Sequence, residues 1–341
     1  MRPITVTIGL AVVLLATIGS VLALRSQHGA PPAAAAASPS ASPQRFNPAQ
    51  TGCAADPHAC GFPDATNTGV PPGTALKAVP GQVSSGPGWR YNAVSQQVEV
   101  TGNHAVLSGL SIRGNLDISA SKVTIKDDKV ITGGPYGISL RNTADVTIED
   151  STVSGSNLTS GRVGAAIGDL YGDSTGIVIR ANNIFAFKTA VQVSSGLVTG
   201  NYMHDPGYIS GDHTNGVLAN GGTKPLMIYH NTILNDLSQT DAISIDTMQV
   251  PGPVANKTIE DNLLAGGGYP IYGGTAFGHQ TSHIVIKGNR FGQGYYPKSG
   301  QFGPVAYFAA QGPGNVWKDN IWDGGGQRST IRLGHDRAGS H

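Results

Sequence analysis

The stretch Ile177-Val178-Ile179-Arg180-Ala181-Asn182-Asn183-Ile184 decides the fold, because its order of residues returns along the chain. The apolar residues Ile177 and Ile179 stand two positions apart, and Asn182 follows three positions after Ile179. Related stretches occupy residues 146–153, 226–233, 257–264 and 284–291. The polar position recurs about every 27 residues, at Asp128, Ser151, Asn182, Asn201, Asn231, Asn262, Asn289 and Asn320. Short alternating strands at this period predict the rungs of a parallel β-helix, in which each rung buries its inner face against its neighbours.

The recurring asparagine has a physical role in such a solenoid. Asparagine tolerates the left-handed backbone conformation, and its side-chain amide can bond the amide of the next rung. We therefore expect these positions to stack into a ladder. A β-sandwich, which is the alternative all-β architecture, gives no reason for asparagine to recur in one register.

The composition excludes other classes of protein. The chain has 341 residues, of which 48 are glycine and 21 proline, and only 13% are charged. Glycine and proline are the poorest helix formers, so a protein built from long helices is excluded. The net charge of +1 provides no field that would attract nucleic acid, and we predict no nucleic-acid partner. With 39% hydrophobic residues, the chain can still bury a core.

The N-terminal part of the chain predicts export. Residues 4–24 form an uncharged apolar run between Arg2 and Arg25, so residues 1–25 are either a cleaved signal peptide or a membrane anchor. Residues 26–51 are rich in Ala, Pro and Ser and predict a disordered linker. Both interpretations place the remainder outside the cytoplasm, either secreted or anchored to the outer face of the membrane. Membrane contact is then expected only through this first segment.

Two cysteines follow the linker, and they predict a disulfide. Cys53 and Cys60 are too few for a zinc site, and an exported chain favours oxidation. We expect the bond to pin residues 52–61 as a cap before the main domain, within an N-terminal cap region over residues 52–94. The β-helix is predicted over residues 95–335, and residues 336–341 form a tail.

The ladder motif carries a resemblance to a known family. Residues 95–335 resemble the right-handed parallel β-helix of the pectate-lyase-like superfamily, and more narrowly secreted actinobacterial β-helix repeat proteins. The resemblance implies an all-β, right-handed parallel β-helix solenoid that acts as a monomer on an extracellular polysaccharide. It also implies that Ca²⁺, held by Asp oxygens, is a possible cofactor, although the sequence identifies no metal ligands.

Each rung is also predicted to contain a second strand before the ladder strand. These strands should lie side by side on successive rungs, at residues 189–194, 211–220, 240–246, 268–274 and 305–308. Val191, Val217 and Ile243 are expected to point inward, so the alternate positions face outward. The outward side chains would form a groove floor bounded by the loops 246–256 and 273–283. We assign substrate binding to Gln192, Asn215, Asn220, Ser244, Tyr272 and Tyr307, whose amides, hydroxyls and rings suit sugars.

The acidic and histidine side chains near these strands are the candidates for catalysis: Asp212, His213, Asp241, Asp246 and His279. A glycoside hydrolase needs two carboxyl groups, whereas a lyase needs a base and a group that neutralises a uronate. The sequence therefore predicts a polysaccharide lyase or glycoside hydrolase. The alternative is a non-catalytic β-helix that binds glycan or serves as a scaffold in the cell envelope.

Overall fold

The computed structural model describes residues 52–159, 164–245, 250–323 and 329–333. The predicted signal or anchor segment, the linker and the tail lie outside these residues. Within them, no helix has the length and apolarity needed to cross a membrane. The described chain is almost entirely β-structure, with two short 3-10 helices, η1 (Gly52–Ala54) and η2 (His58–Cys60).

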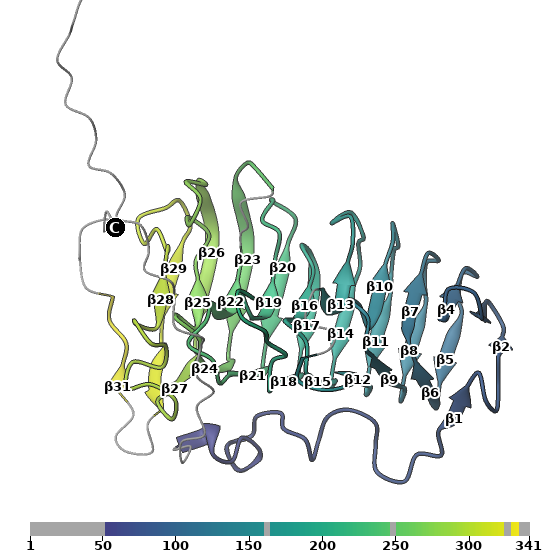
Figure 1. Ribbon diagram of the computed structural model, residues 1–341. Coiled ribbons are helices and arrows are strands. Elements are labelled where there is room, and N and C mark those ends of the chain that lie inside the picture. The colour runs from purple at the N-terminus through teal and green to yellow at the C-terminus, as the bar shows by residue number, and fades with distance from the viewer. Residues whose placement is uncertain (1–51, 160–163, 246–249, 324–328, 334–341) are drawn as a thin grey trace, which may run out of the picture. The chain divides into compact units, whose positions relative to one another are not determined.

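One rung shows how the chain winds. Strand β14 (Val178–Arg180) leads through the ladder position Asn182 into β15 (Asn183–Phe185), then β16 (Thr189–Gln192), and then β17 (Gly196–Thr199). Strand β17 pairs in parallel with β14, so three strands complete one turn. Repetition of this turn stacks the strands into three sheets (Figure 1), which confirms the predicted parallel β-helix arrangement.

The three sheets are here named A, B and C, and their strands follow in order. Sheet A contains β1 (Lys77–Val79), β6 (Leu110–Arg113), β9 (Lys129–Thr132), β12 (Thr152–Gly155), β15, β18 (Tyr202–His204), β21 (Thr232–Asn235), β24 (Leu263–Gly266), β27 (Arg290–Gly292), β30 (Ile321–Asp323) and β31 (Ser329–Thr330). Sheet B contains β2 (Ser85–Gly86), β3 (Trp89–Asn92), β4 (Gln97–Val100), β7 (Asn115–Ile118), β10 (Ile138–Leu140), β13 (Ala165–Asp169), β16, β19 (Asn215–Leu218), β22 (Asp241–Ser244), β25 (Ile271–Tyr272) and β28 (Val305–Ala306). Sheet C contains β5 (Val106–Ser108), β8 (Thr124–Lys126), β11 (Thr147–Glu149), β14, β17, β20 (Leu226–Tyr229), β23 (Val254–Glu260), β26 (Thr281–Lys287) and β29 (Val316–Lys318).

The core is one continuous column of apolar side chains inside the three sheets. Val191, Val217 and Ile243 are all fully buried, as the alternation of the sequence predicts. Ile179 of sheet C and Ile184 of sheet A meet them in the same cluster. Each rung therefore contributes a few branched residues, and burial against the neighbouring rungs supplies the stability that one rung lacks.

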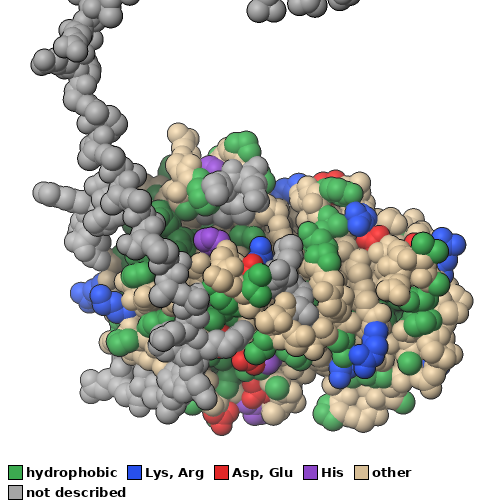
Figure 2. Space-filling view, in the orientation of Figure 1, with side chains coloured by type: hydrophobic (Ala, Val, Ile, Leu, Met, Phe, Trp, Pro, Cys, Tyr) green, Lys and Arg blue, Asp and Glu red, His purple; other side chains and the backbone are tan. Residues whose placement is uncertain are grey.

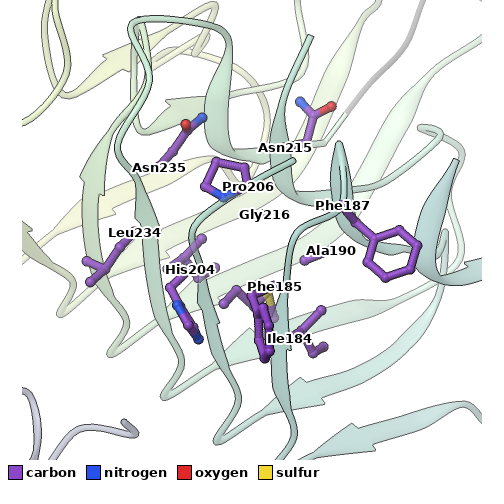
Figure 3. Close-up of a pocket in the computed structure, with 12 residues that line it drawn as sticks. Ile184, Phe185, Phe187, Ala190, His204, Pro206, Asn215, Gly216, Leu234 and Asn235 are labelled. Atoms are coloured by element: carbon purple, nitrogen blue, oxygen red, sulfur yellow. The ribbon is translucent and has the colours of Figure 1, made fainter. Parts of the chain in front are cut away.

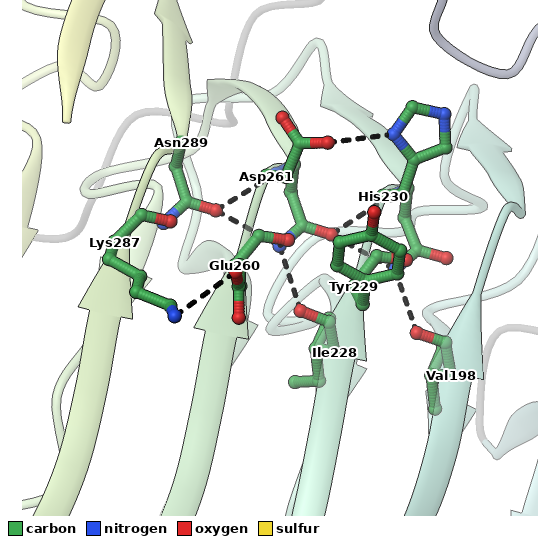
Figure 4. A network of polar contacts seen from close by, with 10 residues as sticks. Val198, Ile228, Tyr229, His230, Glu260, Asp261, Lys287 and Asn289 are labelled. Carbon is green, nitrogen blue, oxygen red and sulfur yellow. Dashed lines mark hydrogen bonds and ion pairs between the residues drawn. The ribbon is translucent and has the colours of Figure 1, made fainter. Parts of the chain in front are cut away.

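The ladder forms at the turn between sheets C and A, at all eight predicted positions, and every member is fully buried. Asn231 shows the pattern: its Oδ1 accepts from the Asn201 backbone N–H, and its Nδ2 donates to the Val198 carbonyl and to Asn262 Oδ1. Figure 4 shows the part of this network that lies between Val198 and Asn289, beside the surface pairs His230–Asp261 and Glu260–Lys287. The ladder thus satisfies buried backbone groups at every turn.

The backbone at the ladder corrects one part of the expectation. The left-handed residue is the one before each ladder position, as at Ala181 (φ 53°), His230 (φ 53°) and Asp261 (φ 51°). The ladder asparagine itself does not have a positive φ. Asparagine is therefore selected by its buried hydrogen bonds rather than by tolerance of the left-handed region.

The disulfide forms between Cys53 and Cys60, as predicted, but its place in the fold differs from the expected cap. The Cys53 N–H donates to Asp323 Oδ2 in the last described rungs, and the Phe62 ring stacks on His230. From there the chain runs back along the outside of sheet A, where Gly69 N–H bonds the Ala181 carbonyl. We call residues 52–76 the strap. It covers sheet A instead of closing the first rung, and β1 is the first strand that enters a sheet (Figure 1).

Candidate functional site

The predicted outward row lies on sheet B in nearly the predicted register. Gln192 pairs with Leu218, Leu218 with Ser244, and Ser244 with Tyr272 on successive strands. The next partner is Ala306 rather than Tyr307, because Tyr307 follows the strand in a left-handed conformation (φ 55°). Its ring nonetheless returns to the row and stacks on Tyr272.

An irregularity at the start of these strands explains the position of Asp241. Both Ala242 and Ile243 donate their N–H groups to the Pro270 carbonyl, which is typical of a β-bulge, and both are fully buried. Two successive inward residues place their neighbours, Asp241 and Ser244, together on the outer side. Strict alternation would have turned Asp241 inward.

The Asp241 carboxylate is fully buried and tightly held. Asn215 Nδ2 lies 2.9 Å from each of its oxygens, and Thr189 Oγ1 lies 3.5 Å from Asn215 Oδ1 on the preceding rung. The Asp241 backbone carbonyl accepts from Asn235 Nδ2 at 3.0 Å. The backbone at Gly267 lies against Thr240 and Asp241. It approaches so closely that a Cβ at position 267 would lie 2.8 Å from the Thr240 carbonyl oxygen. The Thr189–Asn215–Asp241 row is thus a covered polar stack.

Aromatic side chains gather beside this stack. The Tyr272 and Tyr307 rings lie 5.4 Å apart at 19°, and Tyr269 meets Tyr272 edge-on at 5.8 Å. Phe302 packs on Tyr269, and both Phe302 (59% exposed) and Tyr307 (49% exposed) open to solvent. Burial, followed by the negative charge of Asp241, raises the pKa of Tyr272. We call Tyr269, Tyr272, Phe302 and Tyr307 the aromatic platform.

Two other assigned binding residues lie further along the same face. Gln192 Nε2 donates to Asn220 Oδ1 at 3.2 Å, and both side chains are half-buried. Ser244 is buried between Leu218 and Tyr272 in the row. The sheet therefore brings amides, a hydroxyl and aromatic rings onto one face, as the sequence predicts.

The remaining catalytic candidates are less closely connected. Asp212 Oδ2 accepts from the Ile209 N–H of its own loop, and His213 is exposed immediately before the buried Thr214. His279 is half-buried in the loop after β25, where Phe277 lies edge-on to its ring. Asp246 lies outside the described residues. These placements leave the catalytic assignments of Asp212, His213, Asp241, Asp246 and His279 as predictions.

A bound Ca²⁺ ion needs several oxygen ligands gathered in one place. Within the described ranges, no three His, Cys, Asp or Glu side chains gather in a group able to hold a metal ion. The Asp241 oxygens are engaged by Asn215. No described residues are therefore assigned to Ca²⁺.

A small pocket lies at the corner between sheets A and B, where His204, Pro206, Asn215 and Asn235 meet (Figure 3). Its free volume of about 20 Å³ holds a water molecule and no more. His204 bonds Asp205 and Asn183 and stacks on Tyr202, and these contacts hold its ring in place. This pocket is not a sugar site.

A much larger groove opens at the first rungs, and sequence reasoning missed it. Its free volume is about 810 Å³, and its lining includes Arg113, Asn115, Tyr136 and Arg141. The only signal in the sequence was the pair of arginines, separated by a full rung.

On the face drawn in Figure 2, charged side chains of both signs lie in small separate groups.

Comparison of this chain with protein-family models, with curated proteins and with solved structures finds no match.

Proposed function

We propose that this chain is an exported protein of the right-handed, pectate-lyase-like β-helix type that binds a polysaccharide along the outer face of sheet B. The aromatic platform carries the proposal. Aromatic rings with an exposed face bind the apolar faces of sugar rings, and only 6% of the chain is aromatic. Four rings in contact at one end of one sheet therefore form a local concentration that packing of the core does not require.

The polar groups beside the platform supply the complementary contacts. The half-buried Gln192 and Asn220 present amide groups on the same face, and sugar hydroxyls both donate to and accept from such groups. Rungs lie about 4.8 Å apart, so an elongated glycan can contact several successive rungs. The orientation that fits both sets of groups is along the solenoid, from Gln192 towards Tyr307.

Cleavage of the bound polysaccharide is the second candidate, and the position of Asp241 favours it. A sugar on Tyr272 would lie one strand away from this carboxylate, because Asp241 begins β22 and β22 pairs with β25, the strand that contains Tyr272. Asn215 fixes the carboxylate, and Asp212, Asp246, His213 or His279 would supply the second group for hydrolysis or elimination. Asp241 itself can touch substrate only if the backbone at Gly267, which lies against Thr240 and Asp241, moves away.

Binding is tested by incubating the full chain with insoluble or immobilised polygalacturonate, alginate, xylan, β-glucan and chitin, and measuring depletion from solution. We expect retention on at least one, lost in Tyr272→Ala and Tyr307→Ala. Tyr229→Ala is the matched control, since Tyr229 is a half-exposed tyrosine on the outer side of sheet C. Equal retention of all variants, or retention on none of the five, contradicts the proposal.

Cleavage is tested on the glycan that is retained. Unsaturated ends, followed by ultraviolet absorbance, report a lyase, and new reducing ends alone report a hydrolase. If Asp241→Asn abolishes product while glycan retention persists, Asp241 serves the chemistry. If no product forms with the unmodified chain, binding without cleavage is its function.

A further inference from the structure

The groove at the first rungs is a built site of ligand size. Its floor is the outer side of β4, β7 and β10, and its walls are residues 78–81 and 132–136. The volume of about 810 Å³ falls in the range of small-molecule sites, roughly 300–1,000 Å³. The groove lies at the opposite end of sheet B from the aromatic platform. In the order of this sheet, β28 is the sixth strand after β10.

The charge of the groove is positive. Arg113 ends β6 in an exposed position and has no hydrogen-bond or ion-pair partner among the described residues. Arg141 is held by Asp117 at 2.6 Å and by the Tyr171 hydroxyl at 3.1 Å. No Asp or Glu lines the groove, so the guanidinium of Arg113 remains to be matched by a ligand.

Uncharged groups of the lining suit a sugar. Tyr136 belongs to the wall formed by residues 132–136, whereas Tyr91 lines the groove from β3 and packs against the hydrophobic core. Tyr136 lies over the glycine Gly168, whose missing side chain lets the ring approach the sheet to about 3.4 Å from the Cβ position. On the floor, Ser139 Oγ donates to Asn115 Oδ1 at 3.2 Å, and Asn115 Nδ2 lies 3.4 Å from Gln97 Oε1. Ser139 is fully buried, so the half-buried amides of Gln97 and Asn115 are the floor groups that can exchange hydrogen bonds with sugar hydroxyls.

We infer that this groove binds a saccharide that carries an oxyanion, either a carboxylate or a phosphate. The planar guanidinium fork of Arg113 matches both anions, the ring of Tyr136 contacts the sugar, and the half-buried amides of Gln97 and Asn115 bond its hydroxyls. A neutral sugar would leave Arg113 unmatched, and a simple inorganic anion would leave most of the volume unfilled. The inference is independent of the proposed polysaccharide contact at Tyr272 and Tyr307.

Calorimetric titration of the full chain tests this site with three probes: trigalacturonic acid, glucose 6-phosphate and maltotriose. We expect one or both anionic probes to bind, more weakly as salt rises, and maltotriose to bind at least about 10-fold more weakly. Arg113→Ala should weaken the anionic probe about 10-fold or more, and Arg113→Lys should recover part of that loss. Tyr136→Ala should also weaken binding, because it removes one wall.

Two controls separate the groove from the rest of the chain. Lys318→Ala removes an exposed cation of sheet C at the far end, and binding should be unchanged. Tyr272→Ala with Tyr307→Ala disables the aromatic platform, and binding of the short anionic probe should persist. Equal affinity for maltotriose, unchanged affinity in Arg113→Ala, or no binding of either anionic probe overturns the inference. If the probe loses binding in the Tyr272→Ala/Tyr307→Ala variant and keeps it in Arg113→Ala, the probe binds at the aromatic platform. That result also overturns the inference.

Discussion

Asn215 donates from one nitrogen to both carboxylate oxygens of Asp241, at 2.9 Å each, across two adjacent rungs of sheet B. The carboxylate is fully buried, and charge-assisted hydrogen bonds of this kind offset the cost of removing it from water. This pair therefore supports the fold as well as the face that we propose binds glycan.

Asn215→Ala should lower the free energy of unfolding by about 2–3 kcal/mol, because the buried carboxylate loses both bonds. Asn220→Ala is the matched control, since Asn220 is half-buried and bonds only Gln192 among the described residues. Its expected cost is about 1 kcal/mol or less. Urea unfolding followed by circular dichroism measures both, and equal costs would contradict the role assigned to the pair.

Asp128 is the one carboxylate in the buried ladder, and it predicts a pH dependence. Its Oδ1 accepts from the Leu110 N–H at 2.7 Å, while Oδ2 is buried without a partner among the described residues. Burial raises the pKa of Asp128 from 3.8 to about 7. The folded state therefore favours the protonated acid, so this contribution to stability is complete below about pH 4 and is lost as the pH rises through about 7.

Asp128→Asn should remove that loss. We expect the variant and the unmodified chain to differ little near pH 4, and the variant to gain up to about 4 kcal/mol of relative stability by pH 8. The new amide could also donate to a strand carbonyl, as Asn201 Nδ2 does to Ile179. Asp319→Asn, at an exposed side chain, is the control. A stability difference that does not change with pH would contradict the assignment.

The ladder asparagines should be the least replaceable polar residues. Asn231→Ala removes its bonds to Asn201, Val198 and Asn262 and leaves buried backbone groups unpaired. We expect a loss of about 3 kcal/mol or more, against less than about 1 kcal/mol for Asn157→Ala in an exposed loop. Thermal or urea unfolding measures the loss of unfolding free energy in both variants. Similar losses in the two would contradict the structural role of the ladder.

The disulfide should hold the strap and not the rungs. Replacing Cys53 and Cys60 by serine opens a loop of about eight residues, for which about 2–3 kcal/mol is expected. Limited proteolysis should then cut within residues 52–76 while the β-sheet signal persists. Cleavage that begins inside residues 177–291 would show that the bond stabilises the rungs directly.

The sequence predicted the features that repeat. The ladder positions, the inward Val191, Val217 and Ile243, and the row from Gln192 to Tyr272 follow from a period that every rung obeys. The disulfide followed from the number of cysteines together with the predicted export of the chain. These features are local or periodic, and a single chain contains enough copies to reveal them.

Features that occur once were missed or misplaced. The bulge at Ala242 depends on the Pro270 carbonyl of the next rung, and the register of Tyr307 depends on one left-handed residue. The strap reaches Asp323 from Cys53 across 270 positions, and no local pattern specifies such a contact. The groove at Arg113 combines walls from separate rungs, so it exists only after folding.

The central claim is that the stacked pair Tyr272 and Tyr307 holds a glycan on sheet B. The direct measurement is the affinity of the full chain for the polysaccharide it retains, compared by calorimetry with Tyr272→Ala/Tyr307→Ala and with Tyr229→Ala. Loss of two stacking rings should weaken binding by about 10-fold or more in the double variant and leave Tyr229→Ala unchanged. Equal affinity of the double variant and the unmodified chain, with both folded, would contradict the account.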